Sequence, residues 1–459
     1  MGAKNSTLQQ LIFMKSFFKH IAPGLVFIMA MQNAFAIPVS KDSLQNIPLT
    51  LAQVWQMAET NSKAVQITEI HLQGSAEGIK DAKNDRLPDI DADAEYARVT
   101  NMPVYENGLF GVPEQYPVLH NYYKVEGSAY FNIYNGGKTN LEIDAKKSEN
   151  KIADEQKKLT VSEIKLRAAA FYLDMQRSLI FKDLLLKDII AQEKQLAQIR
   201  TLQQNGVVLK SDVLRAELKL SRQKLSLVTL DNDLAIANQK LNILLGLPDE
   251  QRITPTDKFA IDSAGTKTYN EYLADAGSGA YQIKISEQET ELRRLQLKSI
   301  KANVSPKLGL FAEYSYNYPQ ILFYPYSPYV YGLGFYGVKA SFSISSFYHN
   351  YHKAKIAKLD YESQEIEHAE TKDNIRQQVN EAFLRLREDL NRVEVSKTNI
   401  RQATENRRIV YNTYFNQTSL ITDLLDADTQ LLQTRFDLAA AQIAAQLQYY
   451  QLQNITGKL

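Results

Sequence analysis

Apolar residues recur every seven positions along four stretches of the chain, which is the pattern of coiled-coil helices. In the first half they fall at Leu159, Leu166, Leu173 and Ile180, and then at Val213, Leu220, Leu227, Leu234 and Leu241. In the second half they fall at Val379, Leu386, Val393 and Ile400, and then at Leu424, Leu431, Leu438, Ala445 and Leu452. We therefore predict long helices over about 137–204 and 351–415, each followed by an antiparallel partner helix. At ~1.5 Å per residue, each long helix would span roughly 100 Å.

Before each long helix the period changes to two, which is typical of strands. The first such run has Ile90, Ala92, Ala94 and Tyr96 alternating with Asp91, Asp93 and Glu95. Similar runs continue with Val125, Gly127, Ala129, Phe131 and Ile133, then with Leu308, Leu310, Ala312, Tyr314 and Tyr316, and then with Val338, Ala340, Phe342 and Ile344. The sequence thus predicts one strand pair within 87–134 and another within 306–346, four strands in all.

These patterns occur twice, so the chain is expected to consist of two structural repeats. The run Ser211-Asp212-Val213-Leu214 in the first half corresponds to Thr422-Asp423-Leu424-Leu425 in the second. We expect a first repeat at 37–246, a linker with prolines and a glycine at 247–267, and a second repeat at 268–459. Each repeat would contain a helix, a strand pair, a long helix and a further helix. The predicted fold class is mainly α with a small β part.

The N-terminal residues resemble a secretory signal peptide. Lys15 and Lys19 precede the apolar run 25–31, and Ala34-Phe35-Ala36 provides small residues for cleavage. We expect residues 1–36 to be removed, with 1–13 a start-site overextension and Ile37 the first mature residue. The sequence has no cysteine, which excludes disulfides and an acylated cysteine anchor. Positive and negative residues are balanced at 53 and 52, so a nucleic-acid partner is not expected.

The predicted strands favour a membrane location. Four short strands make too little sheet for a soluble domain of this size, whereas strands in a bilayer must close into a barrel. Three chains with four strands each would supply twelve, an even number typical of outer-membrane barrels. Tyrosines flank both strand pairs, as in an aromatic belt at the lipid surface: Tyr105, Tyr116, Tyr122, Tyr123, Tyr324, Tyr326, Tyr329, Tyr331 and Tyr336. Aromatic loops closing over a soluble core, or binding carbohydrate, would be the alternatives.

Taken together, these features resemble the TolC-like outer-membrane efflux proteins, the outer membrane factors. The most specific local match is Tyr414 to Ala427, with Ile421-Thr422-Asp423-Leu424-Leu425-Asp426-Ala427 at the start of a helix. The resemblance implies a homotrimer with a β-barrel in outer-membrane lipid and a long α-helical barrel crossing the periplasm. It also implies docking on a periplasmic adaptor and an inner-membrane pump, for efflux or type I secretion, with no enzymatic activity, cofactor or metal. A periplasmic coiled-coil scaffold or adaptor is the alternative function.

The resemblance also implies a gate at the periplasmic tip. Asp423 and Asp426 would be the constricting carboxylates and Tyr414 a latch, with Asp212 at the matching place in the first repeat and Gly206 in its turn. Rings of carboxylates around a narrow pore favour cations.

Simpler roles stay open for three of these residues. Asp423 and Asp212 could serve only as helix-start carboxylates, and Gly206 only as a helix cap. The chain also departs from the family pattern, with Gln417 where a glycine is usual and Ser419 where the best-known member has a basic latch partner. The sequence predicts neither the cargo nor the class of pump.

Overall fold

The computed structural model describes residues 46–257, 267–320 and 327–459. Residues 46–459 belong to one compact unit. Three predicted features lie outside the described residues: the signal peptide, residues 258–266 of the linker, and the tyrosines Tyr324 and Tyr326.

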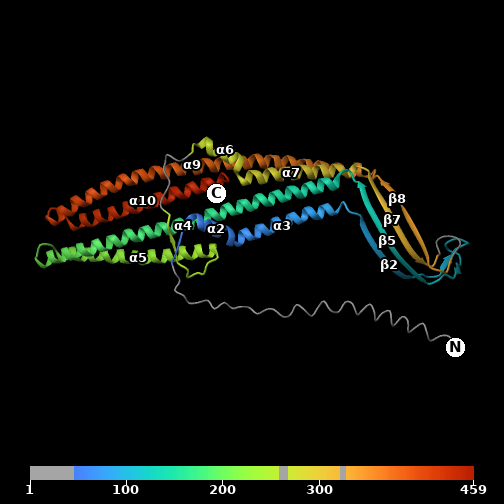
Figure 1. Ribbon diagram of the computed structural model, residues 1–459, viewed down its shortest axis with the longest axis horizontal. Coiled ribbons are helices and arrows are strands. Elements are labelled where there is room, and N and C mark those ends of the chain that lie inside the picture. Colours follow the sequence, from blue (N-terminus) through green and yellow to red (C-terminus); the bar gives the residue numbers. More distant parts are fainter. Residues whose placement is uncertain (1–45, 258–266, 321–326) are drawn as a thin grey trace, which may run out of the picture. The chain divides into compact units, whose positions relative to one another are not determined.

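Nine α-helices lie within these described ranges (Figure 1). They are α2 (Leu51–Asn61), α3 (Lys63–Asn84), α4 (Lys138–Gln204), α5 (Lys210–Leu245), α6 (Tyr269–Gly279), α7 (Tyr281–Lys301), α8 (Ser346–His349), α9 (Tyr351–Phe415) and α10 (Ile421–Ile455). The predicted long helices correspond to α4 and α9. The sequence pattern over 51–86 predicts one helix. The structure divides it into α2 and α3 at Ser62, where the backbone is extended with φ −65° and ψ 121°. None of these helices is both long and apolar enough to cross a bilayer.

Four antiparallel strands form the main sheet, in the order β2-β5-β7-β8. They are β2 (Asp89–Arg98), β5 (Asn121–Tyr134), β7 (Lys307–Tyr318) and β8 (Tyr331–Ser341). The sheet therefore joins both predicted strand pairs, and β2 and β8 are its edges. Two further pairs were not predicted: β1 (Ile47–Leu49) lies parallel to β6 (Ile253–Pro255), and β3 (Met102–Val104) lies antiparallel to β4 (Glu114–Tyr116).

The register of the main sheet places the alternating apolar residues on one face and most charged residues on the other, as the alternation predicted; Phe311, Leu333 and Phe335 lie on the charged face and Arg98 on the apolar one. One face carries Ile90, Ala92, Ala94, Tyr96, Val125, Ala129, Phe131, Leu310, Ala312, Tyr314, Tyr316, Tyr336 and Val338. The other carries Asp91, Asp93, Glu95, Lys124, Glu126 and Glu313. The apolar face is uncovered within the chain: Ile90 is 75% exposed and Tyr336 is 89% exposed.

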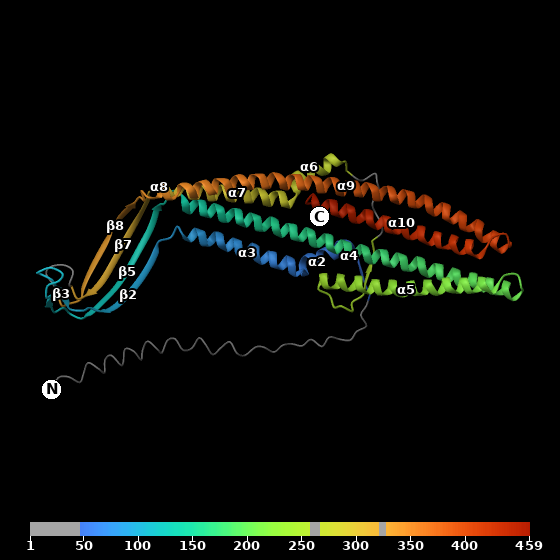
Figure 2. The same cartoon turned by 180° about the vertical axis from the view of Figure 1, so that it is seen from behind.

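The long helices form two hairpins, α4 with α5 and α9 with α10. Along the helical part, α4 packs on α3, α5, α7 and α10, and α9 packs on α6, α7 and α10. Both views of this unit show the sheet at one end of the helices and the two hairpin turns at the other (Figures 1 and 2). The seam residues that the heptads predicted supply much of the core, since Leu173, Leu241, Leu386, Leu424 and Leu452 are each at most 2% exposed.

The short strands β1 and β6 are fixed by a buried tyrosine in the middle of the helical part. The hydroxyl of Tyr172 on α4 donates to the Leu49 carbonyl oxygen at 3.0 Å. It also accepts from the backbone nitrogens of Thr256 and Asp257 at 3.1 and 3.2 Å. The predicted linker is thus bound to the first repeat over its described part.

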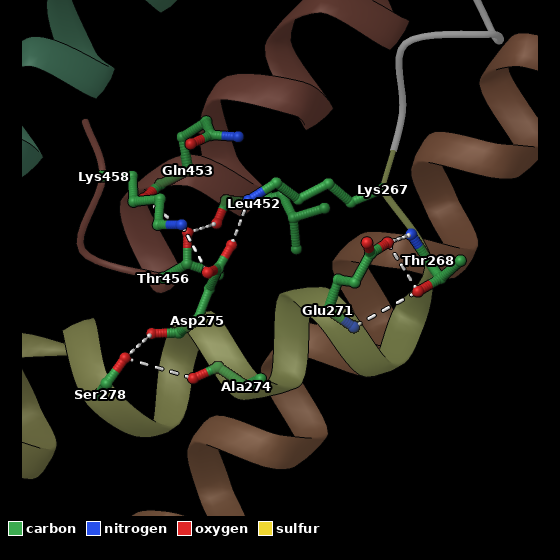
Figure 3. A network of polar contacts seen from close by, with 10 residues as sticks. All are labelled: Lys267, Thr268, Glu271, Ala274, Asp275, Ser278, Leu452, Gln453, Thr456 and Lys458. Atoms are coloured by element: carbon green, nitrogen blue, oxygen red, sulfur yellow. Dashed lines mark hydrogen bonds and ion pairs between the residues drawn. The ribbon is translucent and has the colours of Figure 1, made fainter.

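The C-terminal end of α10 is held against α6 (Figure 3). The Asp275 carboxylate lies 2.6 Å from Lys267 Nζ and 2.5 Å from Lys458 Nζ. A Cβ on Gly279 would lie only 2.3 Å from the Thr456 carbonyl oxygen, so the two backbones are in direct contact there. Thr268 begins α6 with a capping box, in which its hydroxyl accepts from Glu271 N, and Thr50 begins α2 in the same way.

Candidate gate at the hairpin turns

The two hairpin turns have the same backbone geometry. In the first, Gly206 N donates to Gln203 O at 3.0 Å and Val207 N to Leu202 O at 2.9 Å. In the second, Gln417 N donates to Tyr414 O at 2.9 Å and Thr418 N to Thr413 O at 2.8 Å.

Both turns need a left-handed residue, but only one has a glycine there. Gly206 has a φ of +73° with no atom within 4 Å of a Cβ placed on it. Gln417 has a φ of +62° and is the one non-glycine residue with positive φ in the described part of the chain. Gln417, which stands where the family usually has a glycine, therefore adopts a left-handed conformation that costs about 1–2 kcal/mol for most L-residues.

A hydrophobic cluster next to the turns joins both hairpins. It contains Leu196 and Ile199 from α4, Ala216 from α5, Tyr414 from α9, and Ile421 and Leu424 from α10. Tyr414 is 4% exposed, and its hydroxyl has no hydrogen-bond partner among the described residues. Burial raises the pKa of Tyr414 to about 12, and the negative charge of Asp212 adds to this effect. The structure therefore places Asp212 within electrostatic reach of Tyr414.

The two candidate gate carboxylates lie three residues apart near the start of α10, and both are exposed. The Asp423 Oδ2 atom accepts a hydrogen bond from Leu420 N at 3.1 Å, so this residue caps its own helix. Asp426 has no hydrogen bond or ion pair within the ranges that the structure describes. Asp426 is thus the freer of the two to act on an ion. Ser419 is bound to Thr413, whose Oγ1 lies 3.1 Å from the serine Oγ.

A buried charged cluster about two helical turns from the hairpin turns was not predicted. Asp428 on α10 is 3% exposed. Its Oδ1 accepts from Arg407 Nε on α9 at 2.9 Å, and its Oδ2 accepts from Gln195 Nε2 on α4 at 3.0 Å. Lys219 on α5 lies with Nζ 3.9 Å from the Oδ2 atom, and donates to the Leu425 carbonyl oxygen at 2.6 Å. We call Gln195, Lys219, Arg407 and Asp428 the seam cluster.

Burial changes the protonation equilibria around the seam cluster. Desolvation lowers the pKa of Lys219, although Asp428 and Asp188 partly oppose this. Desolvation likewise raises the pKa of Asp188, whose carboxylate accepts a hydrogen bond from Gln223. Both shifts indicate that these charges are costly to bury. One sequence signal could have located the cluster, because Asp428 falls between the seam residues Leu424 and Leu431, where a coiled coil is normally apolar.

Residues 54–247 match the family model described as "Outer membrane efflux protein". The predicted resemblance to the outer-membrane efflux proteins is confirmed. The match covers most of α2, all of α3, the strands β2 to β5, α4 and α5. No protein of curated function matches the sequence significantly.

Solved structures of outer-membrane proteins and channels share this fold. VceC from Vibrio cholerae, an outer membrane protein, is 17% identical, with a TM-score of 0.72 over 89% of this chain and 96% of VceC. The MtrE outer membrane channel from Neisseria gonorrhoeae, solved in its open state, is 15% identical, with a TM-score of 0.71 over 89% of this chain and 88% of MtrE. The CmeC outer membrane channel from Campylobacter jejuni is 14% identical, with a TM-score of 0.70 over 89% of this chain and 85% of CmeC.

The family match also bears on location and activity. The matched family and the solved structures that share this fold are outer-membrane proteins and channels and not enzymes, which agrees with the predicted location and with the prediction of no enzymatic activity.

Proposed function

We propose that this outer-membrane efflux protein is one subunit of a homotrimeric channel. In this arrangement three four-stranded sheets complete a 12-stranded β-barrel in outer-membrane lipid, and the hairpins form an α-helical barrel in the periplasm. The main sheet is the observation that carries the proposal, because both of its edges, β2 and β8, are open and its apolar face is uncovered. In a bilayer, open edges must be paired, and neighbouring copies can pair them.

The second helix of the first hairpin supports the same arrangement. One side of α5 leaves large aliphatic side chains between 52% and 67% exposed: Leu214, Leu218, Leu225, Val228, Ile236 and Ile243. Most are separated by three, four, seven or eight residues, so they form a stripe along the helix. We assign this stripe to the interface with a second copy of the chain. The two expected structural repeats, 37–246 and 268–459, would then supply six hairpins around the tube.

The trimer would work within a tripartite efflux or type I secretion system, joined to a periplasmic adaptor and an inner-membrane pump, exporting small molecules or proteins. The hairpin turns support a docking role, because each exposes a leucine at the equivalent position. Leu209 is 71% exposed and Leu420 is 69% exposed.

The gate would lie just inside these turns. Asp426, and in part Asp423, would form rings of up to six carboxylates around the axis of the trimer. Tyr414 would act through its buried ring, which joins the two hairpins, while Asp212 would act on it electrostatically. Gly206 would allow the first turn its tight backbone.

The test is to purify the native protein from outer membranes and record its conductance in planar bilayers. We expect a heat-sensitive trimer, and cation-preferring pores that trivalent cations block. The double variant Asp423→Ala/Asp426→Ala should lose both the preference and the block but still assemble. Asp437→Ala is the matched control, since this exposed carboxylate lies on the same helix well away from the turn. A monomer in detergent, or a protein absent from the outer membrane, would refute the channel and favour the periplasmic scaffold.

A further inference from the structure

The uncovered apolar face of the main sheet continues past the end of β8 towards the helices. Phe342 continues, in sequence, the alternation that places Tyr336 and Val338 on that face. Its ring packs edge-to-face on Phe347 of α8, with the ring centroids 5.7 Å apart. The short helix α8 links β8 to α9 (Figure 2). Five large side chains here are between 50% and 74% exposed: Phe342, Ile344, Phe347, Tyr348 and Tyr351.

Unpaired positive charges follow these side chains. Lys353 and Lys355 lie at the start of α9, both are exposed, and neither has an ion pair among the described residues. The exposed His349 and His352 stand on either side of Tyr351 in the sequence and add N–H donors. The sequence contains no aspartate or glutamate from position 314 to position 359. We call the five apolar and aromatic side chains, together with Lys353 and Lys355, the junction patch.

The corresponding place in the first repeat is different. There α4 follows β5 as α9 follows β8, but carboxylates stand among its first residues. Lys147 pairs with Asp144 at 2.8 Å, and Lys146 pairs with Glu149 at 3.0 Å. The unpaired lysines therefore belong to the helix below the edge strand β8 and are not a general feature of these helix starts.

The composition of the junction patch fits a lipid surface. At the boundary between a bilayer and water, aromatic rings lie at the level of the headgroups and lysines extend to anionic lipid phosphates. A second copy that pairs with the edge of β8 extends the sheet sideways, so it leaves this face uncovered. The patch lies at the end of the sheet from which the helices leave (Figures 1 and 2). In the proposed channel that end meets the periplasmic leaflet of the outer membrane, which consists of phospholipids.

We propose that the junction patch binds an anionic phospholipid of the periplasmic leaflet, one in each subunit. The ammonium groups of Lys353 and Lys355 bind the phosphate oxygens, and the rings of Phe342 and Phe347 contact the acyl chains. This inference rests on the proposed channel function and adds a ligand to it. A headgroup held at each subunit fixes the depth of the sheet in the bilayer.

The experiment titrates the native trimer, purified in detergent, with phosphatidylglycerol or with phosphatidylethanolamine of the same acyl chains. Native mass spectrometry counts the lipids that the trimer retains. The test variant is Lys353→Gln/Lys355→Gln, which should assemble normally because both lysines are exposed and unpaired. The matched control is Lys372→Gln/Lys397→Gln. It removes the same charge from exposed lysines of the same helix, at least ~25 Å further from the sheet.

We expect the native trimer to bind phosphatidylglycerol more tightly than phosphatidylethanolamine, with a preference that falls as the salt concentration rises. A lysine near an anionic lipid surface strengthens binding about fivefold, so Lys353→Gln/Lys355→Gln should weaken phosphatidylglycerol binding about thirtyfold. Its binding of phosphatidylethanolamine should change little, because the aromatic rings remain. The control should match the native trimer with both lipids.

Three results would overturn the inference while leaving the channel in place. They are equal binding of the two lipids by the native trimer, native-like phosphatidylglycerol binding by the test variant, and an equal loss in the control. If the native protein is instead recovered from outer membranes as a monomer, or is absent from them, the proposed function itself fails.

Discussion

Removing only the hydroxyl of Tyr414 should not loosen the turn end, whereas removing its ring should. The hydroxyl is buried without a hydrogen-bond partner in the described part of the chain. Such an unsatisfied group costs about 1–3 kcal/mol, part of which Tyr414→Phe would recover. The ring is 4% exposed within a cluster that joins both hairpins, so Tyr414→Ala should cost about 3–5 kcal/mol.

The assay measures both variants twice, by the heat needed to dissociate the purified trimer and by the open fraction in planar bilayers. We expect Tyr414→Phe to equal or exceed the native protein in heat resistance and to remain closed. Tyr414→Ala should dissociate at lower temperature and open more often. If Tyr414→Phe opens as often as Tyr414→Ala, the hydroxyl must make a bond in the trimer, and the argument from ring packing is wrong.

Two further predictions follow from the turns and from a buried tyrosine. Gln417→Gly should stabilise the protein by up to about 1.5 kcal/mol, because relief of the left-handed cost of about 1–2 kcal/mol exceeds the glycine entropy of about 0.5–1 kcal/mol. Gly206→Gln should destabilise the protein by a similar amount. Denaturant unfolding that gives both variants the same sign would contradict this. Burial raises the pKa of Tyr172 to about 12. Because this folded pKa lies above the unfolded value of about 10, the stability linked to Tyr172 is present below pH ~10 and is lost as the pH rises towards 12. Unfolding measured across that range should show a smaller loss in Tyr172→Phe, and an unchanged loss would exclude Tyr172 as its source.

The long elements could be predicted because each repeats one physical constraint many times. The seven-residue spacing of Val379, Leu386 and Val393 requires a continuous helix, and α9 covers the predicted range. The alternation from Ile90 to Tyr96 similarly determined which face of β2 is apolar, and the register agrees.

Short or non-local features gave too little signal. The parallel pair β1 and β6 has three residues per strand and joins segments about two hundred positions apart, so no local pattern marks it. The break at Ser62 depends on one residue's backbone. The partners of Asp428 come from three other helices, and their convergence follows from the packing of the hairpins, which the heptads do not specify.

The side chains at the second turn differ from what a latch at that point would require. Ser419 carries no charge and is bound to Thr413, and Tyr414 contributes a packed ring with an unpaired hydroxyl among the described residues. The charged contacts between hairpins instead lie deeper, at Lys219 and Asp428. The strained Gln417 and the exposed Leu420 instead fit contact with a partner, because backbone strain persists where the surrounding structure or a function requires it.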